Sequence, residues 1–238
     1  MARAVLPYPV VPGKTEADIR SIADRFRADP EAYRRYRGEA GVTLERVYWQ
    51  HTQMGDFVVA YVESTASFAE TSAAIARDDS ELGRFFVEKV REVHGFDLTQ
   101  PPQGPEPEIV ADWSDPTATR RGRGLAFCAP PLPDQVERAR AWGRDTFSSP
   151  DMTRTRRDLR QNIEMVMLHQ TPQGPITAIY LEGEDPVAAN REFAASQDPF
   201  NVAFKDMLRQ LYPPFIDFSQ PVPGITEIFD SQAVLARA

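Results

Sequence analysis

The chain has 238 residues, of which 42% are apolar and 26% are charged, close to an average globular domain. Its 27 basic and 35 acidic residues give a formal net charge of −8, which argues against non-specific binding to nucleic acid or to an anionic membrane surface. No stretch approaches the roughly 18 apolar residues of a membrane-spanning helix, and the first residues lack the apolar block of a signal peptide. With Cys128 as the single cysteine, we expect a cytoplasmic protein without an internal disulfide.

The sequence repeats itself after 119 residues. Residues 45–63 align with residues 164–182, and ordinary composition would give about one identical pair in such a stretch. The observed identities are Glu45/Glu164, Val47/Val166, Thr52/Thr171, Gly55/Gly174, Tyr61/Tyr180 and Glu63/Glu182. The same register continues to Phe85/Phe204. We therefore predict two copies of one small domain, at residues 1–113 and 124–238, with a linker at residues 114–123.

Each copy predicts the same elements in the same order. A short apolar strand comes first, at residues 4–10 or 124–129. Thr15 or Asp134 is expected to cap the helix that follows, and Pro30 or Pro150 then begins a second short helix. Two strands joined by a glycine-containing turn come next, at residues 43–51 and 57–63, or 162–170 and 176–182. A broken helical stretch leads to a last strand, at residues 108–113 or 225–230.

The order β-α-β-β-α-β, present twice, predicts an α+β fold of tandem ferredoxin-like repeats. In such a repeat the helices cover only one face of the sheet. A second copy in the same chain is the natural cover for the other face. We therefore expect the two repeats to pack sheet to sheet as an intrachain α/β barrel.

Short motifs in both copies carry a family resemblance. The second copy has Leu-His-Gln-Thr-Pro-Gln-Gly at residues 168–174, Tyr-Leu-Glu at 180–182 and Asp-Pro-Phe at 198–200. The first copy has Tyr-Val-Glu at residues 61–63 but lacks Pro-Phe after Asp79. The copies resemble an uncharacterised bacterial single-repeat family. Their tandem arrangement resembles the dimeric α/β-barrel superfamily, to which antibiotic-biosynthesis monooxygenase-like domains belong. That superfamily hosts cyclases, isomerases, cofactor-free oxygenases and haem enzymes, so the resemblance does not fix a reaction.

Strand alternation divides the side chains of each sheet between two faces. The apolar set Val58, Ala60 and Val62, or Thr177, Ile179 and Leu181, is assigned to the helices. The opposite face is assigned to the barrel interior, as an apolar chamber with a few polar groups. Its candidate substrate-binding residues are Arg46, Tyr48, Gln50, Glu63, Met165, Met167 and Glu182. A one-residue slip of the hairpin would exchange partners and set Glu45 opposite Glu63, a like-charge pair that costs energy.

His169 is the first catalytic candidate, since an imidazole can transfer protons at neutral pH. Tyr61 and Tyr180 are the candidate helpers, although their recurrence together with Glu63 and Glu182 also fits a role in locking the hairpin or bonding the linker. His51 would become a candidate if the hairpin register were shifted by one residue. The alternative for His169 is a solvent-facing position at the end of its strand. Other side chains are assigned to structure: His94 to a helix C-terminus, Cys128 to the core, and Arg154, Arg156, Arg157 and Arg160 to an exposed helix face.

These features predict a cofactor-free enzyme that acts on a small, aromatic or polyketide-like molecule by acid/base chemistry, such as a cyclase, isomerase or monooxygenase. The alternatives are a non-catalytic small-molecule-binding or accessory protein and a scaffold whose barrel is filled by side chains. Three scattered histidines argue against a metal site, and the long helix of the second copy offers no histidine for haem. The sequence leaves open whether the chain forms a homodimer.

Overall fold

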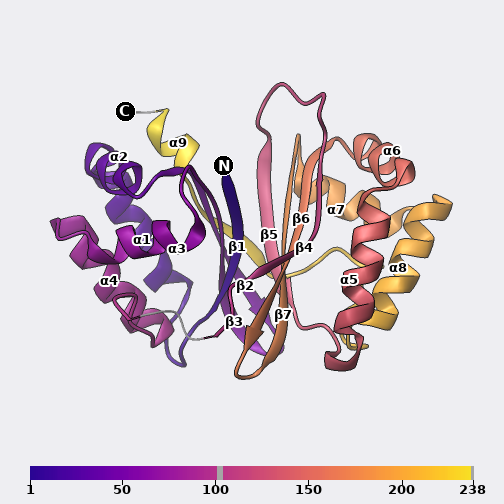
Figure 1. The fold of residues 1–238 in the computed structure, drawn as a ribbon, viewed down its shortest axis with the longest axis horizontal. Helices are drawn as coiled ribbons and strands as arrows, with labels where there is room; N and C mark the ends of the chain where they lie inside the picture. The colour runs from indigo at the N-terminus through magenta and orange to yellow at the C-terminus, as the bar shows by residue number, and fades with distance from the viewer. Residues whose placement is uncertain (101–103, 237–238) are drawn as a thin grey trace. The chain divides into compact units, whose positions relative to one another are not determined.

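The computed structural model in Figure 1 describes residues 1–100 and 104–236. Residues 101–103 and 237–238 of the two predicted repeats lie outside the described part. The chain forms two compact units. Unit 1 contains residues 1–100 and 224–236, and unit 2 contains residues 104–223.

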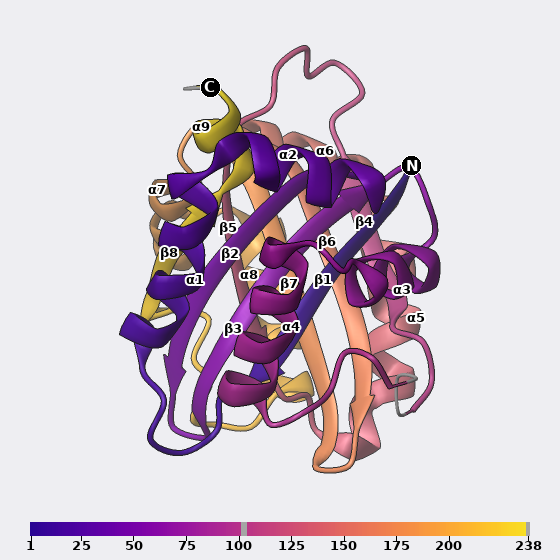
Figure 2. The same ribbon diagram turned by 90° about the vertical axis from the view of Figure 1, so that its left-hand side faces the viewer.

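Unit 1 has a four-stranded antiparallel sheet in the order β1-β3-β2-β8. Its elements are β1 (Ala2–Pro9), α1 (Glu16–Ala28), α2 (Pro30–Glu39), β2 (Val42–Thr52), β3 (Gly55–Ser64), α3 (Phe68–Arg77), α4 (Glu81–His94), β8 (Ile225–Asp230) and α9 (Ser231–Leu235). Figure 2 shows α1 and α4 lying across one face of this sheet. The core between them is built from aromatic and aliphatic side chains such as Phe26, Tyr33 and Phe229.

Unit 2 repeats this plan with the strand order β4-β6-β7-β5. Its elements are β4 (Glu108–Ser114), β5 (Arg123–Ala129), a 3₁₀ turn (Pro133–Gln135), α5 (Val136–Phe147), α6 (Pro150–Asp158), β6 (Gln161–Thr171), β7 (Gly174–Gly183), α7 (Pro186–Ala195) and α8 (Pro199–Leu211). Its helices likewise lie on one face of the sheet (Figure 1). The predicted α+β fold with duplicated ferredoxin-like units is thus present.

The last strand of each sequence repeat lies in the other repeat's sheet. β8 pairs with β2 in unit 1, and β4 pairs with β6 in unit 2. The compact units therefore differ from the contiguous division at residues 1–113 and 124–238. Since the two copies present similar hairpin edges, a strand from either copy can complete either sheet, as in domain swapping.

The hairpin register is the one expected from the sequence. Arg46 lies opposite Tyr61 in unit 1, and Met165 lies opposite Tyr180 in unit 2. Glu45 is paired with Val62 rather than with Glu63. The like-charge register is therefore not the one adopted.

Three local expectations need correction. Asp134 does not cap α5, because Pro133 begins a 3₁₀ turn and the helix starts only at Val136. Arg156 is not on an exposed face: it is only 2% exposed, because Glu164 pairs with it beneath α6. The counterpart of Phe204 is Phe86, not Phe85.

The reason for the last correction is a shorter loop in the second copy. The hairpin strands β3 and β7 keep the 119-residue offset, but α3 begins at Phe68 and α7 at Pro186, an offset of 118. Contacts agree with the shorter offset. Arg37 lies over the ring of Phe86, and Arg156 lies over the ring of Phe204.

Candidate functional site

Each unit contains a cavity between its sheet and its helices. The cavity of unit 1 has a volume of about 130 Å³ and that of unit 2 about 90 Å³. In unit 1, Val58, Ala60 and Val62 line the sheet side. In unit 2, Thr177, Ile179 and Leu181 do so. These are the side chains that strand alternation assigned to the helix-covered face, so that assignment is confirmed.

A buried ion pair lies at the wall of both cavities. In unit 1, Arg37 Nε and Nη2 donate to the carboxylate of Glu45 at 2.9 and 3.0 Å. Tyr33 donates a third hydrogen bond to Glu45, at 2.9 Å. In unit 2, Arg156 pairs with Glu164 in the same way. Because removing a charge from water is costly, a pair of this kind must be kept well bonded.

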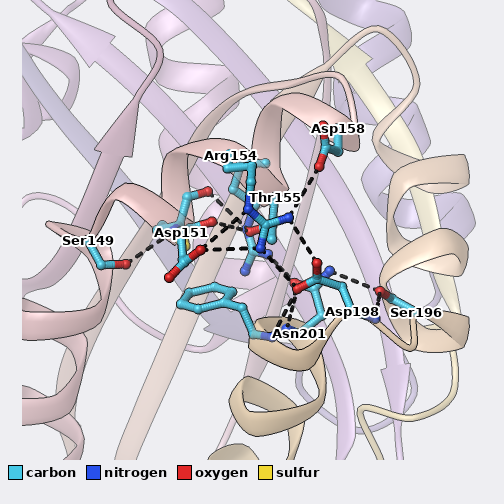
Figure 3. Close-up of polar contacts among 11 residues, drawn as sticks. Ser149, Asp151, Arg154, Thr155, Asp158, Ser196, Asp198 and Asn201 are labelled. Atoms are coloured by element: carbon cyan, nitrogen blue, oxygen red, sulfur yellow. Dashed lines mark hydrogen bonds and ion pairs between the residues drawn. The ribbon is translucent and has the colours of Figure 1, made fainter.

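The two ion pairs differ at the third guanidinium nitrogen. Arg156 Nη1 donates to Asn201 Oδ1 at 3.3 Å. Asn201 lies in the first turn of α8, and its side-chain nitrogen donates a hydrogen bond to Ser196 Oγ at 3.1 Å (Figure 3). Among the residues that the structure describes, Arg37 Nη1 has no hydrogen-bond partner, although Arg37 is only 2% exposed.

The cavities also differ at the end of the long helix. In unit 1 this position is His94, which lines the cavity. Its Nδ1 lies 2.8 Å from the carbonyl oxygen of Pro9. Since a carbonyl only accepts, Nδ1 carries the hydrogen and Nε2 keeps its lone pair. Burial lowers the pKa of His94, so the ring is neutral at neutral pH and can accept a proton.

The counterpart of His94 in unit 2 is Tyr212, by the 118-residue offset of the long helices. Its hydroxyl lies 2.8 Å from Thr177 Oγ1, and burial raises its pKa to about 12. A phenol in that state offers no base at neutral pH. Of these two cavities, as the described residues line them, the one in unit 1 has both a base and a buried arginine in its wall.

Tyr8 also lines the unit 1 cavity, next to His94. Its ring packs on His94 with centroids 5.5 Å apart. Burial and the charge of Glu45 raise the pKa of Tyr8 to about 12, against the opposing effect of Arg37. Tyr8 therefore stays protonated as a neutral wall of the cavity.

The residues predicted as site lie on the other face of each sheet and line neither cavity. In unit 1, Tyr48, Gln50, Tyr61 and Glu63 are all buried, and Tyr61 donates to Glu63 at 2.5 Å. Arg46, only 1% exposed, bonds Asp230 and Gln232. Arg46 therefore has a structural partner, in the last strand of unit 1.

The unit 2 set is arranged in the same way. Met165 and Met167 are buried, whereas His169 is partly exposed. Tyr180 donates to Glu182 at 2.7 Å, and Glu182 accepts the backbone N–H of Gly122 at 3.0 Å. The bond to Gly122 fits the structural interpretation, in which this glutamate holds the linker.

Sequence reasoning missed the cavity residues. Arg37 and Glu45 are eight residues apart, and so are Arg156 and Glu164, which is a repeat the sequence already contains. His94 was assigned to the helix end, and Gly95 does close that helix, with φ of 74° and its N–H on Arg91. No sequence pattern indicates that His94 also lines a cavity.

Other features of the described residues carry less chemistry. A polar surface pocket in unit 2 contains Arg120, Arg121, Arg157 and Arg160, of which Arg157 forms a forked pair with Asp115. Within residues 1–100 and 104–236, no three His, Cys, Asp or Glu side chains are grouped as a metal site. No helix in that part of the chain is long and apolar enough to span a membrane.

Comparison with known proteins gives two structural neighbours. No protein-family model and no curated protein matches the chain. A protein of Fusobacterium nucleatum subsp. nucleatum, provisionally named a monooxygenase, is similar with a TM-score of 0.51 and 8% identity, over 96% of this chain and 92% of that one. An anthrone oxidase-like protein is similar with a TM-score of 0.52 and 9% identity, over 94% and 88%. At these identities the similarity shows a shared fold.

Proposed function

We propose that the unit 1 cavity binds a small apolar molecule and that His94 removes a proton from one of its carbon atoms. The observation that carries this proposal is the position of His94: a neutral imidazole, its tautomer fixed by Pro9, on the wall of an apolar cavity. A general base must be held in the correct protonation state close to its substrate. The volume of about 130 Å³ suits a molecule built on one aromatic ring, since a cavity of about 150 Å³ can bind benzene.

The proposed step balances without a bound group. The C–H proton passes to His94 Nε2, and its electron pair stays on the substrate as an enolate. Return of the proton at another carbon gives isomerisation. Attack of the enolate on dioxygen, followed by loss of water, gives a ketone from a CH₂ group. The names of the two structural neighbours favour this oxidation.

The face predicted from the sequence remains a second candidate. His169 with Tyr61 and Tyr180 would then act in the interior of a closed intrachain barrel, as the resemblance to the dimeric α/β-barrel superfamily implies. The hydrogen bonds of Tyr61 and Tyr180 to neighbouring glutamates favour the structural role for these two residues.

Deuterium exchange separates the two candidates without knowledge of the natural substrate. 2-Indanone, a small ketone whose two CH₂ groups are benzylic and acidic, is incubated in D₂O with the protein, and its exchange is followed by NMR. We expect His94→Asn to lower the protein-dependent exchange about 10²-fold or more, the usual contribution of a general base. The matched variant His51→Asn removes an exposed histidine bound to Asp56 and should change nothing. Loss of exchange in His169→Asn, with His94→Asn unaffected, would move the site to the other face.

A further inference from the structure

The unpaired nitrogen of Arg37 marks the unit 1 cavity as built for a ligand atom. A buried donor without an acceptor is destabilising, and more so when it is charged. The second copy shows how the protein satisfies the same nitrogen: Asn201 accepts from Arg156 Nη1 (Figure 3 shows Asn201 at the start of α8). Unit 1 keeps the arginine and lacks that acceptor.

The local backbone explains why no side chain replaces Asn201 in unit 1. The counterpart of Asn201 is Gly83, in the first turn of α4. A Cβ atom at Gly83 would lie 2.2 Å from Asp78 Oδ1 and 2.6 Å from its carbonyl oxygen. No larger residue fits there without displacing the backbone. The remaining surroundings of the guanidinium are aromatic: the ring centroids of Phe26, Tyr36 and Phe86 lie 5.3, 4.7 and 4.3 Å from its carbon. The Tyr36 hydroxyl donates to the carbonyl oxygen of Ile75 at 3.3 Å.

We propose that Arg37 Nη1 donates a hydrogen bond to a neutral oxygen of the ligand, a ketone or similar carbonyl, and that the unit 2 cavity lacks this function. This inference rests on the proposed function, in which the unit 1 cavity is the ligand site. It adds the chemical class of the ligand and a role for Arg37. It also separates the two cavities of the duplicated fold.

The acceptor is neutral because the charges at the cavity already balance. Glu45 neutralises Arg37 and accepts three hydrogen bonds. A carboxylate ligand would place a second negative charge next to Glu45. Among the described residues that line the cavity, Arg37 is the one Lys or Arg side chain, and His94 is neutral. A carbonyl oxygen bonds the free N–H without that penalty.

Binding of three matched probes tests the inference: 2-indanone, indane and indane-2-carboxylate. Affinities are measured by calorimetry or ligand-observed NMR on the whole chain. We expect 2-indanone to bind about tenfold more tightly than indane, the effect of one hydrogen bond to a charged donor, and the carboxylate to bind weakest. Equal affinities for 2-indanone and indane, or tightest binding of the carboxylate, would overturn the proposal.

Two matched variants locate the donor. Arg37→Lys keeps the charge beside Glu45 but removes the third donor of the fork, and should abolish the preference for the ketone. Arg156→Lys makes the same change in unit 2 and should leave the preference intact. The reverse result would place the site in unit 2. If Arg37→Lys does not fold, the wild-type probe series and Arg156→Lys still decide.

The same measurements in His94→Asn separate this inference from the proposed reaction. Because the variant lacks the base but keeps Arg37, we expect it to retain the preference for 2-indanone. If the wild type shows no deuterium exchange but His94→Asn still prefers 2-indanone, the proposed reaction is wrong and the binding role of Arg37 is retained. Loss of the preference in His94→Asn would contradict the assignment of the acceptor to Arg37.

Discussion

The cavities of unit 1 and unit 2 share one plan and differ at two positions. Both keep the arginine–glutamate pair beneath the second helix, Arg37–Glu45 and Arg156–Glu164. In unit 2 the third guanidinium nitrogen is bonded by Asn201, and the long helix ends in a hydroxyl bonded to Thr177. In unit 1 that nitrogen is free and the helix ends in His94. The shared pair thus belongs to the fold, and the differences are those on which we base the proposed ligand site in unit 1.

The largest expected effect comes from breaking the shared pair. Arg37→Met or Arg156→Met leaves a buried carboxylate without its cation, which should cost about 3–5 kcal/mol of unfolding free energy. We expect the unit 2 variant to lose more, because Tyr33 still donates to Glu45, whereas Met152 stands at the equivalent position beside Glu164. Hydrogen exchange of β2–β3 and β6–β7 measures each unit separately.

The double variant Arg37→Met/Glu45→Leu is the control for this experiment. Replacing both charges with apolar groups should recover most of the loss. A double variant as unstable as Arg37→Met would show that packing of the arginine, rather than the uncompensated charge, explains the effect.

A smaller effect on stability is expected at the position where one copy has glycine and the other arginine in a left-handed backbone conformation. Gly41 has φ of +79°, and its counterpart Arg160 has φ of +57°, the single non-glycine residue with positive φ in the described chain. Gly41→Arg should destabilise unit 1 by about 1–2 kcal/mol, since side chains disfavour this region and a Cβ would lie 2.8 Å from Thr65 Oγ1. Arg160→Gly should stabilise unit 2 by about 0.5 kcal/mol. Thermal unfolding measures the stability of both variants. Melting temperatures that shift equally and in the same direction would contradict the opposite effects expected for the two substitutions.

The smallest effect is a pH dependence confined to unit 1. Burial lowers the pKa of His94 in the folded chain, so the unfolded chain binds its proton first as the pH falls through about 6.5. The unfolded state then binds more protons, and unit 1 loses stability on acidification, with a slope of at most about 1.4 kcal/mol per pH unit. His94→Asn should remove this contribution. Tyr212 adds none here, since its pKa of about 12 lies far outside the range. An unchanged slope in His94→Asn would contradict the burial of a neutral imidazole.

Local sequence patterns predicted the repeat, the strands and the hairpin register, because these follow from periodicity and cross-strand pairing. The division of each sheet into two faces followed from the same alternation, as Val58, Ala60 and Val62 show. The exchange of β4 and β8 between the two sequence repeats was not predictable, since either copy's hairpin edge can accept either strand.

The candidate site was harder to predict, because it depends on which buried polar atom remains unsatisfied. The sequence predicts Arg156 on an exposed helix face, whereas the structure buries it in an ion pair with Glu164. The difference between Arg37 and Arg156 arises from Gly83, Asp78 and a loop shortened by one residue, none of which has a recognisable motif. His94 was correctly placed at a helix end, but its contact with the cavity depends on tertiary packing.

A crystal structure with bound 2-indanone tests the central claim most directly. The account predicts the ligand between β3 and α4 of unit 1, with its oxygen within hydrogen-bond distance of Arg37 Nη1. A ligand found instead in the unit 2 cavity, or beside Tyr61, Tyr180 or His169, would contradict it.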